Sequence, residues 1–291
     1  MFFVIHFMNK MNAQLEGKLI PSVLTFPKAL EIWEKKTTFY NPKNIEGELG
    51  HGCGGTVYSY KGGSCVKVMY DVEDEESCAE LAEEFNFLCL VWYSAPQNGR
   101  KPFIEPLFLE IYQNSLVIGL ERFEGTTLKE ILGKGLHFQL NLEIALDLCE
   151  TMRHLNDLSI FHADFGVHNV MVSRDFSRLR VIDFGFAYHL NEPRKYSSVY
   201  EYKAPEELDG KKTRTPQEMK KMQIWNMGML LLSVKFKIRR YDFGEGEEDL
   251  SPHHLKKYVE SFQLTDESPV DRIIKAALAE NPDERIILDI Q

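Results

Sequence analysis

The segment from residue 161 to residue 187 constrains the fold of this chain most, because it places acidic and amide side chains beside short apolar runs. The tripeptide Asp-Phe-Gly occurs three times in the chain, at Asp164, Asp183 and Asp242, so only its context is informative. Asp183 follows a strand-like run at residues 179–182, whereas Asp164 has a histidine two residues before it and an asparagine five after it. Asp242 lies between two arginines and an acidic run, which is typical of a loop. The first two aspartates are therefore the candidates for chemistry.

The composition is that of a globular protein and argues against several kinds of partner. With 291 residues, of which 44% are hydrophobic and 27% charged, the chain can form one large domain or two small ones. Its net charge of −10 argues against a nucleic-acid partner, because such proteins need a basic face. The five scattered cysteines include no CxxC pair, which disfavours a disulfide framework or a zinc site and favours a reducing, cytoplasmic or nuclear compartment.

No membrane anchor is expected from the sequence. No apolar run reaches the roughly 18 residues that a transmembrane helix needs. The apolar start of the chain lacks the basic region and the small-residue cleavage site of a signal peptide.

The pattern of apolar residues divides the chain into a strand-rich first half and a helix-rich second half. Residues 1–43 are mixed in character, and we expect them to form an N-terminal extension. We predict an α+β fold over residues 44–290, with two lobes and a ligand cleft near their junction: a β-rich N-lobe at 44–121 and an α-helical C-lobe at 125–290. The predicted strands lie at 45–52, 55–60, 64–70, 103–112, 115–120, 170–172 and 179–182. One predicted helix begins near residue 71. Four others span residues 142–155, 217–236, 253–262 and 269–280.

Four residues at the start of the strand-rich half, Gly50, Gly52, Gly55 and Val57, fit the pattern G-x-G-x-x-G-x-V. Glycines let backbone N–H groups approach phosphate oxygens without side chains in the way. The same pattern also suits a plain glycine-rich hairpin, so both interpretations stand. A dinucleotide-binding motif is disfavoured, because a strand rather than a helix follows the glycines.

Two charged residues on the next elements are candidates for holding phosphate. Lys67 lies in the following strand, on the same face as Cys65, where a lysine can neutralise phosphates; a solvated surface lysine is the alternative. Glu84 lies beside the apolar stripe of the predicted helix, from which a carboxylate can reach inward to a lysine. Glu80 and Glu83 compete for that role, and a solvated acidic helix face is again the alternative.

The strongest signal comes from His162, Asp164, Asn169, Asp183, Phe184 and Gly185 together. Asp164 would accept or orient the proton of an attacking hydroxyl. Asn169 and Asp183 would supply the oxygen ligands that Mg²⁺ prefers. Each aspartate alone also suits a helix cap or a turn, but the whole set indicates phosphoryl transfer.

Further motifs follow in order, namely YKAPEEL at 202–208, IWNMG at 224–228 and NPDER at 281–285. With them, the chain from residue 45 to residue 290 resembles the eukaryotic protein kinase family. The resemblance implies ATP and Mg²⁺ as cofactors. It also implies that Glu206 and Arg285 pair to brace the C-terminal lobe.

The resemblance further implies an adenine site. Leu120 would be the gatekeeper, and Glu121–Phe123 the hinge that binds adenine through its backbone. The ring would lie between apolar side chains that include Val57, Cys65 and Met171. The glycines and Lys67 would face the phosphates.

Several positions depart from the family pattern, on the substrate side and in the bracing of the catalytic loop. Ala163 stands where the family has the arginine that grips an activation-segment phosphate, and Gly166 where serine/threonine kinases have a lysine. Val199 replaces a threonine that usually meets that lysine, and Gln223 replaces an aspartate that braces the loop. His168 is a candidate for supplying part of the missing positive charge.

We therefore expect an ATP-dependent protein kinase that transfers the γ-phosphate to serine or threonine hydroxyls of a protein that the sequence does not name. An ATP-binding pseudokinase that acts as a scaffold is one alternative, motivated by Ala163, Val199 and Gln223. A small-molecule phosphotransferase is another, because the loop HADFGVHN also resembles those of aminoglycoside and choline kinases, which lack the lysine too.

Overall fold

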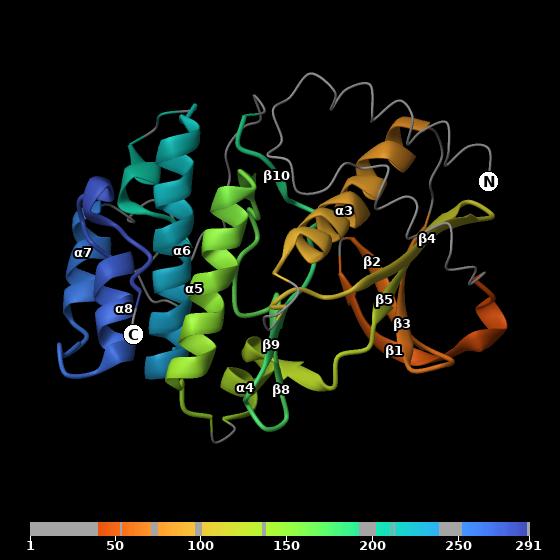
Figure 1. The fold of residues 1–291 in the computed structure, drawn as a ribbon, viewed down its shortest axis with the longest axis horizontal. Coiled ribbons are helices and arrows are strands. Elements are labelled where there is room, and N and C mark those ends of the chain that lie inside the picture. Colours follow the sequence, from red (N-terminus) through yellow and green to blue (C-terminus); the bar gives the residue numbers. More distant parts are fainter. Residues whose placement is uncertain are drawn as a thin grey trace. The chain divides into compact units, whose positions relative to one another are not determined.

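The computed structural model describes residues 40–52, 54–70, 75–96, 101–135, 138–191, 202–209, 211, 213–238 and 252–289 (Figure 1). The described residues form two compact units. The first contains the residues up to Phe123 together with Asp183–Gly185, and the second contains Glu124–Ile182 and the residues from Phe186 onward.

The first unit is built on one antiparallel sheet of five strands in the order β1-β2-β3-β5-β4. The hairpin between β2 and β3 pairs Tyr60 with Ser64, and Gly62 and Gly63 adopt positive φ angles of 91° and 77° in its turn, which glycine tolerates. The strand predicted from residue 103 begins only at Pro106, since proline suits the first position of a strand. The strands are β1 (Ile45–Gly52), β2 (Gly55–Tyr60), β3 (Ser64–Met69), β4 (Pro106–Tyr112) and β5 (Ser115–Glu121).

Helix α3 (Glu75–Ser94) lies along one face of this sheet (Figure 1). Phe85 of α3 packs there with Met69 and Ile118, which alternate with residues of the opposite face. On that opposite face, Val66 and Val68 pack in a second cluster together with aromatic side chains. The central strands β3 and β5 are therefore buried on both sides, whereas β1 is mostly exposed, and α3 presents its inward-facing residues to β3.

The second unit is mainly helical, as predicted. Its longest helix, α6, is buried along most of its length and begins with a capping box in which Thr215 and Glu218 bond each other's backbone N–H. Helices α5, α6 and α8 pack on one another (Figure 1). The helix predicted to reach residue 280 ends at Ala277, before the turn that carries Asn281 and Pro282. The helices are α4 (Leu128–Lys134), α5 (Leu142–Asp157), α6 (Pro216–Phe236), α7 (Pro252–Glu260) and α8 (Pro269–Ala277).

Among the described residues of this unit, short strands and 3₁₀ turns connect the helices. One pair is β7 (Ile160–Phe161) with β10 (Tyr188–His189), and a three-stranded sheet has the order β6-β8-β9. The three strands are β6 (Gly125–Thr127), β8 (Val170–Ser173) and β9 (Leu179–Val181), and the 3₁₀ turns are η3 (Pro205–Leu208) and η5 (Pro282–Glu284).

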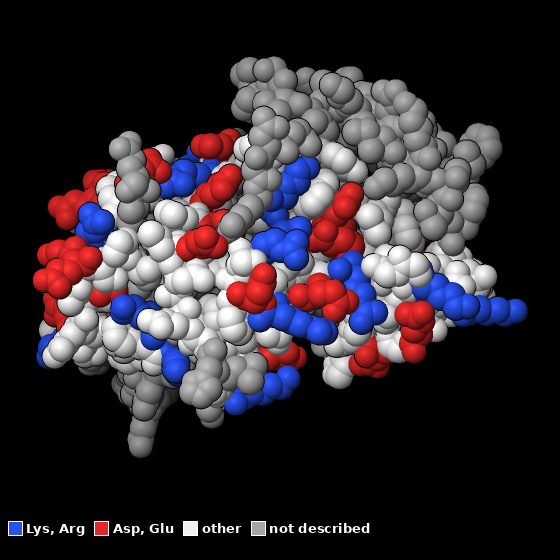
Figure 2. All heavy atoms as spheres, turned by 60° about the horizontal axis from the view of Figure 1, so that its bottom comes forward, with Lys and Arg blue, Asp and Glu red and all other residues white. Residues whose placement is uncertain are grey.

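Some predictions fall on residues outside the described part of the chain. They concern the N-terminal extension up to residue 39, the loop at Asp242 and the departure at Val199. Within the described part, none of the helices offers a stretch that is both long and apolar enough to cross a membrane. Figure 2 shows basic and acidic side chains interspersed over the face it presents.

Candidate active site

Lys67 lies in the middle of β3, between Val57 of β2 and Ile118 of β5, and only 5% of it is exposed. Its Nζ atom donates to both carboxylate oxygens of Glu84, at 2.9 and 2.7 Å, and to Oδ1 of Asp183 at 3.1 Å. The three residues belong to the same compact unit. The structure therefore brings together a buried ammonium group and two carboxylates, which a solvated surface lysine would not do.

Glu84 is the helix residue that reaches this lysine. It lies between the buried residues Phe85 and Ala82 of α3 and is itself 3% exposed, whereas Glu83 is half-buried and the side chain of Glu80 lies outside the described part of the chain. The sequence alone left three glutamates in competition, because the rotation of a helix about its axis is set by packing on the sheet. That packing directs Glu84 toward β3.

The charges of this cluster depend on one another. Burial lowers the pKa of Lys67, but the negative charges of Glu84 and Asp183, together with their hydrogen bonds, outweigh burial and raise it above its ordinary value. Burial also raises the pKa of Glu84, and this effect is larger than the lowering caused by the positive charge of Lys67. A buried charge is costly without its partner, so neither residue can be removed singly without leaving an uncompensated group.

Asp183 combines an unusual backbone conformation with a carboxylate that solvent reaches. Its φ angle is 60°, a left-handed conformation that aspartate and asparagine adopt more readily than most residues. Its side chain is 38% exposed, and Oδ1 also accepts a hydrogen bond from the N–H of Gly185 at 3.3 Å. The next residue, Phe184, is buried near Phe103 with 6.1 Å between the ring centroids. The turn is thus anchored by Phe184 while the carboxylate remains accessible.

Asp164 and Asn169 lie on the loop between β7 and β8 in the second unit. The Nδ2 group of Asn169 donates to the backbone oxygen of Asp164 at 2.9 Å and to its Oδ2 at 2.7 Å. His168 Nε2 lies 3.0 Å from the other carboxylate oxygen, Oδ1. The backbone oxygen of Asn169 accepts from the N–H of Ile182, the residue before Asp183, at 2.9 Å. The loop therefore holds the Asp164 carboxylate from both sides.

The surroundings of Asp164 favour its ionised form. Burial raises the pKa of its carboxyl group, but the hydrogen bond and charge of His168, the charge of His162 and the bond from Asn169 outweigh burial, so the pKa lies below its ordinary value. An ionised carboxylate is an acceptor only, which suits a group that takes or orients a proton.

Gln223 of α6 braces this loop with every polar group of its side chain. Its Oε1 accepts from the N–H of His162 at 3.0 Å, and its Nε2 donates to the oxygen of Ile160 at 2.9 Å and to Asn156 Oδ1 at 3.1 Å. Gln223 is 1% exposed, so these bonds form away from water. The contribution of Asn156 had no signal in the sequence, because it depends on a contact across 67 positions.

The glycine-rich segment is the hairpin of β1 and β2, where Gly50 pairs with Val57 and Gly52 with Gly55. Gly55 has a φ angle of 119°, and a Cβ atom there would lie 2.5 Å from the backbone oxygen of Val68, so the fold itself requires glycine. A Cβ atom at Gly50 or Gly52 would meet nothing within 4 Å. The fold does not explain those two glycines, and their open surroundings suit the close approach of a ligand.

The residues expected around adenine are divided between the two units. Cys65 is buried on β3 opposite Leu120 of β5. The N–H of Glu121 donates to the backbone oxygen of Glu105 at 2.9 Å, and Phe123 is half-buried where the first unit ends. Met171 is half-buried on β8 of the second unit.

Each unit offers one oxygen donor of a kind that suits a hard cation. Because Asn169 uses its Nδ2 group on Asp164, its Oδ1 oxygen is the atom left to bind a metal. Asp183 contributes an accessible carboxylate, and oxygen ligands of these two kinds are those that Mg²⁺ prefers. No group of three or more His, Cys, Asp or Glu side chains in the described ranges is arranged to hold a metal by itself.

Comparison with known proteins places this arrangement in a family. The protein kinase domain matches residues 44–289, so the chain belongs to the protein kinase family. Its α+β, two-lobed fold is the fold of that family, as predicted. Membership implies the use of ATP and Mg²⁺ in general terms.

Individual relatives are similar at low identity. A probable casein kinase II subunit alpha homolog of Encephalitozoon cuniculi is 27% identical over 140 residues, which cover 44% of this chain and 42% of the relative. A probable serine/threonine-protein kinase of Dictyostelium discoideum is 28% identical over 206 residues, which cover 67% of this chain and 47% of the relative. A serine/threonine-protein kinase of Schizosaccharomyces pombe is 27% identical over 173 residues, which cover 57% of this chain and 38% of the relative. The chain thus aligns with less than half the length of each of these relatives.

Proposed function

We propose that this chain is an ATP- and Mg²⁺-dependent protein kinase that phosphorylates serine or threonine hydroxyls. The observation that carries the proposal is the buried cluster of Lys67, Glu84 and Asp183. In this cluster a buried ammonium group is held by one buried and one accessible carboxylate. Burying these charges lowers the stability of the fold, and phosphate binding is a function that explains why they are there.

Each residue of the site has a proposed role in phosphoryl transfer. Lys67, oriented by Glu84, neutralises the phosphates of ATP, and Asp183 and Asn169 supply oxygen ligands. Bound Mg²⁺ would neutralise charge on the phosphates. Asp164 orients the acceptor hydroxyl and takes its proton, and its lowered pKa keeps it ionised at neutral pH.

For adenine we propose the residues named from the resemblance. The backbone of Glu121–Phe123 binds the ring edge, Leu120 is the gatekeeper, and apolar contacts come from Val57, Cys65 and Met171. The open space at Gly50 and Gly52 supports an approach of the backbone to phosphate, with Gly55 fixing the hairpin.

The choice of serine and threonine rests on the relatives from Dictyostelium discoideum and Schizosaccharomyces pombe, whose names describe serine/threonine-protein kinases. Because the chain covers less than half of each, the acceptor is part of the proposal.

The test is intact-mass analysis of the purified chain after incubation with Mg·ATP and a histone as a generic basic substrate. Asp183→Asn removes one proposed metal ligand while asparagine tolerates the left-handed backbone, so the variant should fold and transfer no phosphate. Asp266→Asn is the matched control, because the Asp266 side chain is 82% exposed in a surface ion pair and should keep normal transfer. Removing Mg²⁺ with EDTA should abolish transfer by the wild type.

Other outcomes would favour the alternatives. Binding of Mg·ATP, detected as a rise in Tm, without transfer to any protein would indicate a pseudokinase. Consumption of ATP only with an aminoglycoside, choline or a sugar would indicate a small-molecule kinase. Normal transfer by folded Asp183→Asn would contradict the proposed site.

A further inference from the structure

We propose that His168 is a positioning residue for phosphoryl transfer, and that it occupies the space and the bonding role that a side chain at position 166 would otherwise have. The inference rests on the proposed kinase function and extends it to the substrate side of the loop. It is carried by two observations, a hydrogen bond to Asp164 and a steric conflict at Gly166.

The hydrogen bond fixes the carboxylate of Asp164 from a direction that Asn169 does not cover. His168 Nε2 lies 3.0 Å from Oδ1, and the Nδ2 group of Asn169 lies 2.7 Å from Oδ2. An ionised carboxylate only accepts, so the hydrogen lies on Nε2 of His168. With one donor on each oxygen, rotation of the carboxylate about its last bond is restrained, and the lone pairs that remain point in defined directions.

The steric conflict explains why position 166 is glycine. A Cβ atom there would lie 2.8 Å from Cε1 of His168 and 2.9 Å from Cε2 of Tyr202. Gly166 does not have a positive φ angle, so its backbone conformation does not require glycine, and only the space does. The backbone N–H of Val167 donates to the hydroxyl of the same Tyr202 over 3.4 Å.

Gly166 and His168 are therefore a matched pair. A lysine at position 166, as the family resemblance leads one to expect, has no room while the His168 ring points at Asp164. Conversely, the ring can reach Asp164 only because position 166 carries no side chain. The chain replaces a flexible cation two residues after Asp164 by a rigid donor four residues after it.

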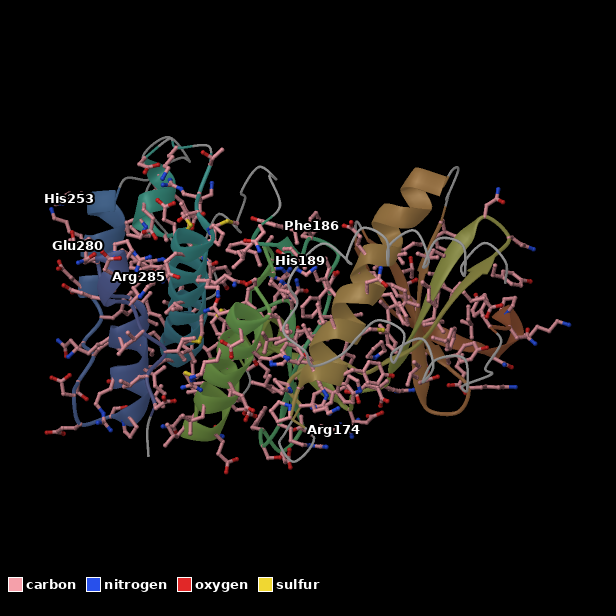
Figure 3. The ribbon with its side chains drawn as sticks, turned by 45° about the horizontal axis from the view of Figure 1, so that its top comes forward. Arg174, Phe186, His189, His253, Glu280 and Arg285 are labelled. Carbon is pink, nitrogen blue, oxygen red and sulfur yellow. The ribbon has the colours of Figure 1, made fainter. Side chains whose placement is uncertain are left out.

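The first experiment measures kcat and the KM for ATP of His168→Ala, His168→Gln and a control, with a histone as substrate. We expect His168→Ala to lower kcat by about 10- to 100-fold, with the KM for ATP within about twofold of the wild type, because only the orientation of Asp164 is lost. His168→Gln keeps an N–H donor at a similar distance and should recover kcat to within about threefold of the wild type. The control is His253→Ala, because His253 lies exposed on α7 (Figure 3).

An unchanged kcat in His168→Ala would overturn the positioning role. So would a His168→Gln variant that is as impaired as His168→Ala at the same Tm, since a donor would then not be the group that matters.

The second experiment needs no catalysis. The Tm of Gly166→Ala is compared in the wild-type background and in His168→Ala, as a double-mutant cycle. We expect Gly166→Ala to lower Tm by several degrees when His168 is present and by less than half as much when it is absent. Equal shifts in the two backgrounds would show that the ring does not fill the space, and the matched pair would be wrong.

The two experiments separate failure of the inference from failure of the proposed function. If the wild type transfers phosphate to no protein, the kinase proposal fails and the positioning role fails with it. The Tm cycle still decides whether Gly166 and His168 are sterically paired.

Discussion

Replacing Arg285 by methionine removes a fully buried guanidinium group that ties together three parts of the helical unit. Its Nη1 and Nη2 atoms donate to the two carboxylate oxygens of Glu206 at 2.5 and 2.8 Å, and its Nε donates to the backbone oxygen of Ala279 at 2.8 Å. The guanidinium also lies over the ring of Trp225, 4.7 Å from its centroid. Arg285 has no exposed surface, and Figure 3 shows it beside α6 and α8.

The expected loss follows from these contacts. Breaking a buried ion pair by removing one partner costs about 3–5 kcal/mol. The Glu206 side chain is 18% exposed, so water can reach it in the variant, and methionine still packs on Trp225. The lower end of the range, about 3 kcal/mol, is therefore expected. For a domain of this size that corresponds to a fall in Tm of about 6–12 °C.

The assay is thermal unfolding followed by circular dichroism at pH 7, with Arg174→Met as the matched control. Arg174 forms an ion pair with Glu124 at 3.3 Å, but the two side chains are 84% and 60% exposed, so its replacement should lower Tm by less than about 2 °C. Arg285→Lys should behave like Arg285→Met rather than like the wild type, because lysine keeps the charge but cannot form the bidentate pair. Equal Tm changes in Arg285→Met and Arg174→Met would refute the reasoning.

Two further predictions concern stability. Gly119→Ala should destabilise the sheet unit by about 1–3 kcal/mol, because the new methyl group would overlap the ring of Phe108. The control is Gly47→Ala in β1, where the new methyl group would meet nothing within 4 Å. In thermal unfolding, Gly119→Ala should lower Tm and Gly47→Ala should leave it unchanged. Asp271→Asn should lower stability by about 2 kcal/mol at pH 7, because the buried carboxylate of Asp271 forms an ion pair with Lys235 at 2.6 Å. Burial raises the pKa of Asp271, but its hydrogen bonds and the charge of Lys235 outweigh burial and lower it, so the contribution is complete above about pH 5 and is lost as the pH falls through the folded-state pKa. The difference in Tm between wild type and Asp271→Asn should therefore be constant from pH 5 to pH 7 and narrow below pH 4; a difference that widens at low pH would contradict this.

The sequence predicted those features that depend on local periodicity. Alternation in β3 put Lys67 and Met69 on one face, and helical spacing put Glu84 beside Phe85 and Leu88, so a contact between lysine and glutamate followed once α3 was packed on that face. The choice among three glutamates needed the rotation of the helix, which the spacing does not contain.

The features that sequence reasoning did not reach depend on contacts between distant segments or on the absence of a side chain. The sequence identifies the glutamine at position 223 only as a departure from the family pattern, but its Nε2 group donates to Ile160 and Asn156. The glycine at position 166 is also a departure that the sequence shows. The residues next to it in the sequence do not indicate that a tyrosine 36 positions later packs against it. Such features follow from packing in three dimensions.

These two departures have a common physical character. At position 223 and around position 166, where the family resemblance leads one to expect an aspartate and a lysine, the chain has groups that form directed hydrogen bonds, to the backbone of His162 and to the carboxylate of Asp164. A hydrogen-bonded amide avoids much of the desolvation cost that a buried charge carries, and it still fixes geometry. The buried charge of the site is then concentrated at Lys67 and Glu84, where it is paired. The loop around Asp164 is organised for orientation, and for that reason the test of His168 compares a variant that loses the donor with one that keeps it.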